Sequence, residues 1–336
     1  MHARAIHGTS LICLCALCAS ARAVTLGVDG TRFTLDGKPT FLLGISYYGG
    51  LGAPDETVAA DLDDLAARGV NWIRVWATWT SGGSDVSAVD GAGAARQPYM
   101  DRLVRLVGEA DVRGIVVDVT LTRGGGEGSV STLDAHLEAV RTIARALAGS
   151  GNVYLDLANE RNVGDKRYVP SKELGDLRDA VKGIDPTRLV TASQGGDISD
   201  EEIAEYVKVA RVDFICPHRP RAAASPAQTE EATRRYLERL TTLGAPMPVH
   251  YQEPFRRDYG EWQPTAQDFL ADLRAAVRGG AAGWCLHNGS PRRGEEGPAR
   301  SFDLRPSQPR LMEQLDGDEL GVVRRMGEVA AEAARG

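Results

Sequence analysis

Two glutamates occupy equivalent places in the sequence, each directly after a short apolar run. Glu160 follows VYLDLA and Asn159, and Glu253 follows MPVHYQ. A facing pair of carboxyl groups can cleave a glycosidic bond: one donates a proton to the leaving oxygen, and the other, ionised, attacks or stabilises the anomeric carbon. We therefore expect Glu160 to be held neutral, partly by the charge of Glu253, while Glu253 stays ionised. Either glutamate could instead be a solvated carboxylate or a salt-bridge partner.

The elements that position these residues follow a repeating pattern. Short apolar runs, typical of buried parallel strands, occupy residues 41–46, 71–77, 114–121, 153–158, 188–193, 212–217, 247–252 and 281–287. Helical periodicity between and after these runs predicts helices over residues 55–68, 133–147, 227–243, 265–277 and 322–334.

Eight strand–helix repeats predict an α/β fold, a (β/α)8 TIM barrel, rather than an open doubly wound sheet. No G-x-G-x-x-G motif follows the first run, which argues against a dinucleotide fold. The turn dipeptides Asp29-Gly30 and Asp36-Gly37 predict a short β-hairpin before the barrel. Chemistry in such barrels lies at the carboxyl ends of the strands, so the fourth and seventh strands would bring Glu160 and Glu253 to the same mouth.

The first residues have the pattern of a signal peptide. An apolar run over residues 11–19 is followed by Ala21-Arg22-Ala23, a small-x-small cleavage pattern. We predict a signal peptide over residues 1–23 and a single domain over residues 24–336, secreted or periplasmic; an uncleaved anchor or a buried helix is the alternative. Cys216 and Cys285 remain in the mature chain, on strands six and eight, and we expect small buried apolar residues rather than a disulfide.

Composition narrows the function classes. A formal net charge of −7 does not provide the basic footprint that nucleic acids require. A metal site would need clustered His and Asp at the strand ends, but only His218 and His287 of the six histidines are placed there. We therefore expect no metal, no cofactor, no nucleic-acid partner and no membrane contact after signal cleavage, and we expect a monomer.

Together these residues resemble the clan A glycoside hydrolases, in particular family 5, which holds cellulases and β-mannanases. The resemblance runs from DGTRFTLDGKPTFLLG to the eighth run, and its most specific part is Asn159-Glu160. It implies that Glu160 is the acid/base, that Glu253 is the nucleophile and that Asn159 holds the sugar 2-hydroxyl. In VNWIRVWA it places Arg74 as the support of the nucleophile.

Further residues complete the expected substrate site. The resemblance places His218 along the substrate site, and Trp76 and His287 also lie at strand ends. Arg74 could instead form a structural ion pair, Asn159 could bond loop backbone, and His218 and Trp76 could be ordinary packed residues. Other aromatic residues near strand ends are Tyr47, Tyr48, Trp79 and Trp262. Asp118 and Asp156 lie inside strands, where we expect pairing within the barrel.

Two strand ends differ from the family pattern. After His218 the sequence continues Arg219-Pro220, where the family commonly has an aromatic residue. In GWCLHNG, His287 stands where the family has a stacking Trp, and Trp284, three residues earlier, would lie roughly 10 Å below the mouth. We therefore expect Trp284 to belong to the core.

The leading hypothesis is a retaining hydrolase of β-linked oligo- or polysaccharides, similar to a cellulase or mannanase, that acts by double displacement. The alternative is a secreted carbohydrate-binding barrel with weak or no catalysis, which the two altered strand ends favour. Retention predicts a carboxyl separation of about 5 to 5.5 Å, against about 6.5 to 9.5 Å for inversion.

Overall fold

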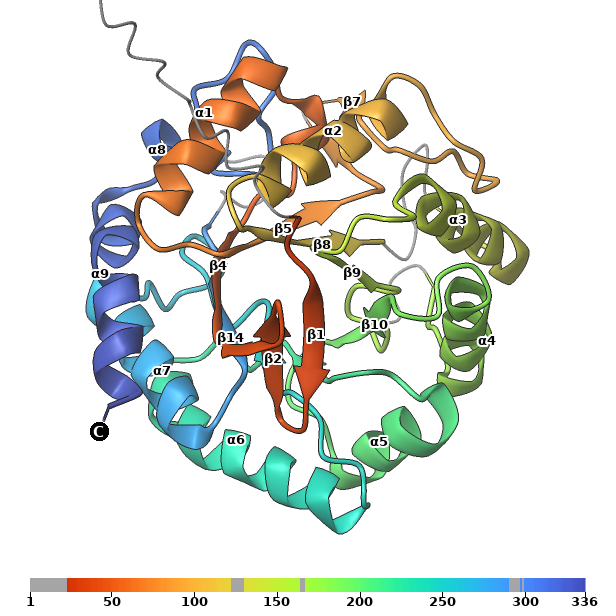
Figure 1. Cartoon of the computed structure of the whole chain (residues 1–336). Helices are drawn as coiled ribbons and strands as arrows, with labels where there is room; N and C mark the ends of the chain where they lie inside the picture. Colours follow the sequence, from red (N-terminus) through yellow and green to blue (C-terminus); the bar gives the residue numbers. More distant parts are fainter. Residues whose placement is uncertain are drawn as a thin grey trace, which may run out of the picture.

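Parallel strands surround the axis of the molecule in chain order (Figure 1). The computed structural model describes residues 23–81, 83–121, 130–163, 167–289, 297 and 299–335. The strands are β4 (Leu42–Ser46), β5 (Trp72–Trp76), β8 (Val116–Thr120), β9 (Val153–Asp156), β10 (Leu189–Thr191) with β11 (Ser193–Gln194), β12 (Cys216–Pro217), β13 (His250–Tyr251) and β14 (Gly283–Leu286).

The hydrogen-bond register joins these strands into a barrel. Seven of them form one sheet in the order β10-β9-β8-β5-β4-β14-β13. The remaining gap is bridged by β12, which pairs in parallel with β11; Ile215, directly before β12, forms a parallel bridge with Val249, directly before β13. The predicted (β/α)8 barrel is therefore confirmed.

Helices surround the barrel on its outside (Figure 1). They are η1 (Gly50–Gly52), α1 (Asp55–Ala66), α2 (Tyr99–Asp111), α3 (Leu133–Ala146), α4 (Ser171–Lys182), α5 (Asp200–Glu205), the π-helix η2 (Tyr206–Ala210), α6 (Ser225–Thr242), α7 (Ala266–Gly279), α8 (Leu311–Gln314) and α9 (Gly317–Ala333). The predicted helices correspond to α1, α3, α6, α7 and α9. The sequence analysis did not predict α2, α4, α5 or α8, although the buried Leu103 and Leu106 of α2 and the buried Leu174 and Leu177 of α4 recur at helical spacing.

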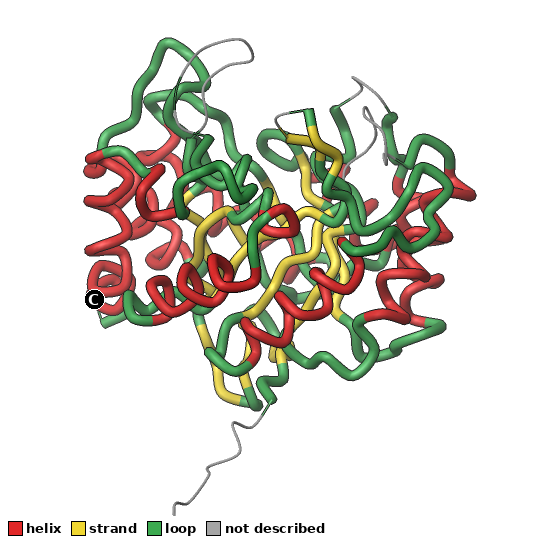
Figure 2. The backbone as a smooth tube through the Cα atoms, turned by 90° about the horizontal axis from the view of Figure 1, so that it is seen from above, coloured by secondary structure: helices red, strands yellow, loops and turns green. Residues whose placement is uncertain are grey.

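The predicted N-terminal hairpin is also confirmed, and it closes one end of the barrel. It consists of β1 (Leu26–Asp29), β2 (Arg32–Leu35) and β3 (Lys38–Thr40), which pair antiparallel. Phe33 is fully buried against Phe214, with ring centroids 4.9 Å apart. Figure 2 shows this hairpin at one end of the molecule and the long loops that follow the strands at the other. A short ribbon of β6 (Thr80–Ser81) and β7 (Ser84–Asp85) lies in the loop after β5.

Apolar side chains fill the barrel and the layer between strands and helices. Inside the barrel, Trp72, Tyr154 and Cys216 are buried together with residues of the hairpin. Cys216 and Cys285 are both free and buried, as predicted. Trp284 is fully buried and donates a hydrogen bond to Asp272 (2.7 Å), so its assignment to the core is confirmed.

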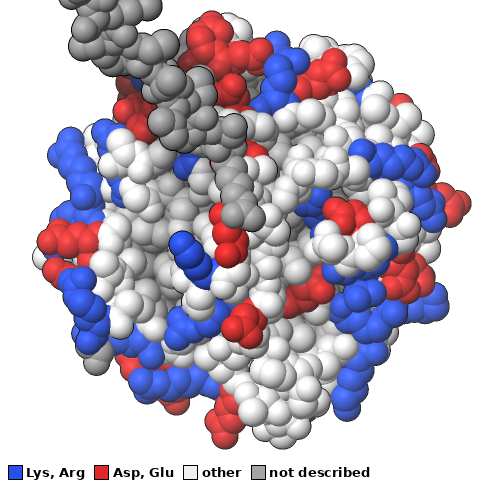
Figure 3. Space-filling view, in the orientation of Figure 1, with Lys and Arg blue, Asp and Glu red and all other residues white. Residues whose placement is uncertain are grey.

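On the face that carries the hairpin, basic and acidic side chains are interspersed around the edge (Figure 3). Among the described residues, no helix combines the length and apolar character needed to cross a bilayer. The signal-peptide prediction falls on residues 1–22, which lie outside the described residues, together with Ala23 at their border.

Candidate active site

Glu160 and Glu253 lie together at the carboxyl end of the barrel. Glu160 follows β9 and Glu253 follows β13, and both are brought to the same mouth by the parallel direction of the strands. Three atoms lie within 4.8 Å of one another: a carboxylate oxygen of Glu160, a carboxylate oxygen of Glu253 and a ring nitrogen of His218. The structure therefore brings together the two glutamates that the sequence analysis selected on strands four and seven.

Glu253 is nearly buried and is surrounded by donors. Its Oε1 accepts hydrogen bonds from Arg74 and from the Tyr48 hydroxyl (3.0 Å). Its Oε2 accepts a hydrogen bond from Arg221 Nη2 (3.0 Å) and lies 3.7 Å from Nδ1 of His287. Both carboxylate oxygens are thus stabilised in the ionised form.

Arg74 is held rigidly beneath Glu253 by a fully buried network. From β5 it donates to Thr120 (2.9 Å), Asp156 (2.8 Å) and Asn159 (3.0 Å). Asp118 also lies 3.2 Å from its Nε. As expected, Arg74 contacts Glu253. Asp118 and Asp156 are also paired inside the barrel, as expected, and both pair with Arg74. Asn159 lies beside Arg74 rather than bonding loop backbone.

Electrostatics favour an ionised Glu253. Burial raises the pKa of Glu253, but the neighbouring His287, His218, Arg74 and Arg221 outweigh it and leave the pKa well below its ordinary value. Burial also keeps the pKa of His287 itself well below its usual value. Because His287 is then uncharged at neutral pH, we attribute the ionised state of Glu253 to the two permanently charged guanidinium groups.

Glu160 has an unusual backbone conformation and a more open position. Its φ of 44° lies in the left-handed region, which is uncommon for residues other than glycine, and its N–H donates to Ser193 Oγ (2.9 Å). Its side chain keeps 20% of its surface exposed, against 5% for Glu253. Glu160 is therefore the carboxyl group of the pair that solvent reaches.

The expectation that Glu160 is held neutral is wrong, because its pKa is lowered. Burial and the charge of Glu253 raise the pKa of Glu160, but the hydrogen bond from His218 Nδ1 (3.3 Å) and the charge of Arg221 (3.5 Å) lower it more. The resulting pKa lies below the ordinary value. The hydrogen bond from His218, and to a smaller extent the charge of Arg221, which the sequence analysis did not place, thus outweigh the effect of the second carboxylate.

Aromatic residues line the mouth beside the carboxylates. Trp76 lies 4.7 Å from the Tyr48 ring and 4.3 Å from the Trp79 ring, centroid to centroid. Phe302 contacts Tyr48 edge-on (4.8 Å). Trp76 therefore borders the site through Tyr48, whose hydroxyl binds Glu253. Trp262 instead contacts Phe255 (4.9 Å).

Sequence reasoning missed three polar residues of the site. Arg221 lies in the loop after β12 and contacts both glutamates. Gln252 donates to Asp118 (2.7 Å) and to Tyr154 (3.0 Å) and faces His218. Arg256, three residues after Glu253, lies over the Tyr259 and Phe302 rings. The only sequence signal for these arginines was their position just after a strand end, which many surface arginines share.

The triad of Glu160, His218 and Glu253 has ligand atoms close enough to hold a cation. However, Arg221 Nη2 already lies 3.0 Å from Glu253 and 3.5 Å from Glu160. A metal ion between the carboxylates would be repelled by this guanidinium. The residues present therefore suit an organic substrate better than a resident metal.

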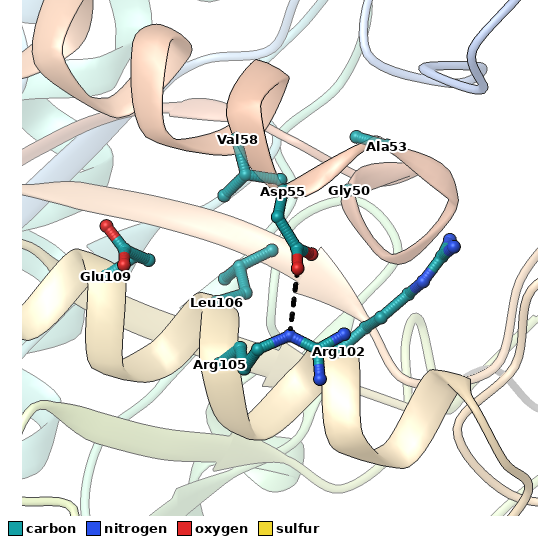
Figure 4. Close-up of a pocket in the computed structure, with 8 residues that line it drawn as sticks. All are labelled: Gly50, Ala53, Asp55, Val58, Arg102, Arg105, Leu106 and Glu109. Carbon is teal, nitrogen blue, oxygen red and sulfur yellow. Dashed lines mark ion pairs between the residues drawn. The ribbon is translucent and has the colours of Figure 1, made fainter.

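A separate recess lies between α1, η1 and α2 (Figure 4). Its charged residues include Asp55 and Arg105, which form an exposed ion pair of 3.2 Å. Surface pairs of this kind contribute little energy and are satisfied by each other. The recess is lined by Gly50, Ala53, Asp55, Val58, Arg102, Arg105, Leu106 and Glu109. None of these residues contacts Glu160 or Glu253 in the described structure, so the recess is separate from the candidate site.

Comparison with known proteins adds structural relatives. No protein-family model matches the sequence, and no curated protein matches it. Among solved structures, a family 5 glycoside hydrolase from Bacteroides vulgatus aligns with a TM-score of 0.66 at 15% identity, over 90% of this chain and 70% of that one. A β-mannanase from the blue mussel Mytilus edulis aligns with a TM-score of 0.60 at 15% identity, over 92% and 97%.

A third structure is a family 5 mannosidase from Rhizomucor miehei in complex with mannosyl-fructose. It aligns with a TM-score of 0.62 at 13% identity, over 93% of this chain and 98% of that one. This chain has the fold of these glycoside hydrolases. At this level of identity the likeness is one of fold, and the function has to be argued from the site itself.

Proposed function

We propose that this protein is a retaining glycoside hydrolase that cleaves β-linked glycans by double displacement. The observation that carries the proposal is the approach of one oxygen of Glu160 and one of Glu253 to within 4.8 Å at the carboxyl end of the barrel. Retaining enzymes place their carboxyl groups about 5 to 5.5 Å apart, whereas inverting enzymes leave about 6.5 to 9.5 Å for a water molecule. The short separation supports retention.

The surroundings of each carboxyl group suggest its role. Glu253, buried and ionised by Arg74 and Arg221, suits the nucleophile, which attacks the anomeric carbon as the bond to the leaving oxygen breaks. Glu160, the more exposed group, suits the acid/base. It gives its proton to the leaving oxygen in the first step and takes one from the attacking water in the second, when the ester to Glu253 is broken.

The low pKa of Glu160 has a consequence for activity. The first step needs a protonated Glu160, but His218 and Arg221 favour the carboxylate. A depressed pKa means that the protonated fraction grows as pH falls, so we expect the free enzyme to work best on the acid side of neutrality.

The decisive experiment is covalent trapping with a 2-deoxy-2-fluoro β-glycoside, followed by peptide mapping. We expect the label on Glu253, no label in Glu253→Gln, and normal labelling in Glu261→Gln, a control in an exposed glutamate of the same loop. A label on another residue would overturn the nucleophile assignment. Negligible turnover of β-glycosides, equal in the wild type, Glu160→Gln and Glu253→Gln, would favour the alternative of a carbohydrate-binding barrel.

The cellular location follows from the N-terminal sequence and belongs to the same proposal. We propose that residues 1–23 direct export and that the mature, monomeric enzyme begins near Val24, secreted or periplasmic. Mass spectrometry of the exported protein tests this, and an intact N-terminus on the exported chain would contradict it.

A further inference from the structure

Two arginines at the mouth of the barrel are not accounted for by the proposed hydrolysis of a neutral glycan. Arg221 lies with its Cζ 4.2 Å from the Tyr259 ring centroid, and Arg256 lies with its Cζ 5.0 Å from the same centroid. Arg221 also contacts Glu160 and Glu253 directly. The two guanidinium groups are therefore neighbours at the edge of the candidate active site.

Arg256 lacks the partners that a guanidinium group normally has. Within the described chain it forms no ion pair, and its Nε is buried without a hydrogen-bond partner. Burial and the neighbouring charge of Arg221 lower the pKa of Arg256. Its guanidinium lies between the Tyr259 and Phe302 rings, 5.0 and 5.1 Å from their centroids. A half-buried cation of this kind gains from an anion that binds to it.

The charges around Glu160 and Glu253 also indicate that an anion binds here. Arg74, Arg221 and Arg256 lie around Glu253, and Arg74 also contacts Asp118 and Asp156. Burial raises the pKa of Asp118 to about 8, so Asp118 adds no full negative charge near neutral pH. When Glu160 carries the proton that the first step requires, Glu253 alone faces both Arg221 and Arg256. Among the described residues, three guanidinium groups then face only Asp156 and Glu253, and a neutral sugar cannot supply the missing negative charge.

We propose that the substrate carries an anionic group, such as the carboxylate of a uronic acid or a sulfate, which binds Arg221 and Arg256. This inference rests on the proposed glycoside hydrolase function and specifies its substrate class. Guanidinium groups bind such anions through paired, charge-assisted hydrogen bonds. The exposed ring of Tyr259 offers the adjoining apolar contact for a sugar.

An anion at this position would also assist the acid/base. Arg221 is one of the groups that favour the ionised form of Glu160. If the substrate anion pairs with Arg221, that influence on Glu160 weakens, and Glu160 takes up its proton more readily. Substrate binding and activation of the acid would then be coupled through one side chain.

The test compares three chromogenic substrates that differ only at C6: 4-nitrophenyl β-D-glucoside, its 6-sulfate and 4-nitrophenyl β-D-glucuronide. For wild-type protein we expect kcat/KM for an anionic substrate to exceed that for the glucoside by about 10- to 100-fold, the range of a charge-assisted contact. In Arg256→Gln this preference should fall about tenfold or more, and Arg256→Lys should retain part of it. Arg325→Gln, an exposed arginine on α9, should keep the wild-type preference.

The anionic substrates also distinguish the two sources of charge, because a preference for the sulfate over the glucuronide assigns the ligand to sulfated glycans. If the glucoside is cleaved as well as the anionic substrates and Arg256→Gln does not change the ratio, the anion inference is overturned while the hydrolase function stands.

A binding measurement separates failure of the inference from failure of the hydrolase function. Calorimetric titration of Glu160→Gln protein with a glucuronic-acid-containing β-linked disaccharide and with cellobiose needs no turnover. If no glycoside is cleaved, tighter binding of the acidic disaccharide that is lost on adding Arg256→Gln still supports the anion site. Equal binding of both disaccharides overturns it.

Discussion

Removal of the Arg221 guanidinium should move both limbs of the pH profile of kcat/KM towards higher pH. The acidic limb reports ionisation of Glu253 in the free enzyme, and the basic limb reports loss of the proton from Glu160. Arg221 lies beside both carboxylates and favours their ionised forms. Without it, each carboxyl group keeps its proton to a higher pH, so both limbs move in the same direction.

The size of the movement follows from the distances. At the 3.5 Å between Arg221 and Glu160, the Coulomb energy is about 1 kcal/mol in a water-like medium and about 5 kcal/mol at an effective dielectric constant of about 20. The side chains of Arg221 and Glu160 are only 17% and 20% exposed, so the water-like value is a minimum. At about 1.4 kcal/mol per pH unit, the basic limb should rise by at least about one pH unit.

The assay is the pH dependence of kcat/KM for a chromogenic glycoside that the wild type cleaves. Arg221→Met should show the full displacement, Arg221→Lys a smaller one, and Arg325→Met, on the exposed face of α9, none. Thermal unfolding of each variant shows whether the protein is folded. A folded Arg221→Met enzyme whose basic limb stays in place, or moves to lower pH, would refute the assignment of Arg221 as a group that keeps Glu160 ionised.

Three further predictions concern the stability of the barrel. Phe33→Ala should lower the free energy of unfolding by about 3 to 5 kcal/mol, because this buried ring fills the closed end; a loss below about 1 kcal/mol in urea denaturation would contradict this. Gly44→Ala should cost at least about 3 kcal/mol, since its Cβ would meet the Trp72 carbonyl oxygen at 2.1 Å; a thermal midpoint equal to the wild type would show that the close approach is absent. Ser199→Ala should cost about 1 kcal/mol through loss of the capping box with Glu202, measured by denaturant midpoint; a cost no larger than that of Glu328→Ala, at an exposed site on α9, would contradict this.

The sequence by itself determined the barrel and the places of its main polar residues. Eight apolar runs alternating with helices left few other folds, and the direction of parallel strands then assigned Glu160, Glu253 and Arg74 to one end. These inferences depend on local periodicity and on one topological rule, both of which can be evaluated from a single sequence. The same reasoning placed Trp284 correctly in the core.

Local patterns were less informative where strands are short or interrupted. The sixth and seventh runs form only two-residue strands, β12 and β13, which are joined to each other by the single bridge between Ile215 and Val249. The fifth run is divided into β10 and β11, which pair with different neighbours. Hydrophobicity marks a buried segment, but the extent of its pairing depends on the strands beside it.

Only the tertiary structure decided the electrostatics of the site. Arg221, Arg256 and Phe302 come from the loops after β12, β13 and β14, and no local pattern shows that they meet around Glu253 and Tyr259. The ionisation of Glu160 was predicted incorrectly because the hydrogen bond from His218 and the charge of Arg221 depend on distances of a few ångströms, which periodicity does not predict. The sequence determined which carboxylates face each other, and the folded loops determined which charges stand between them.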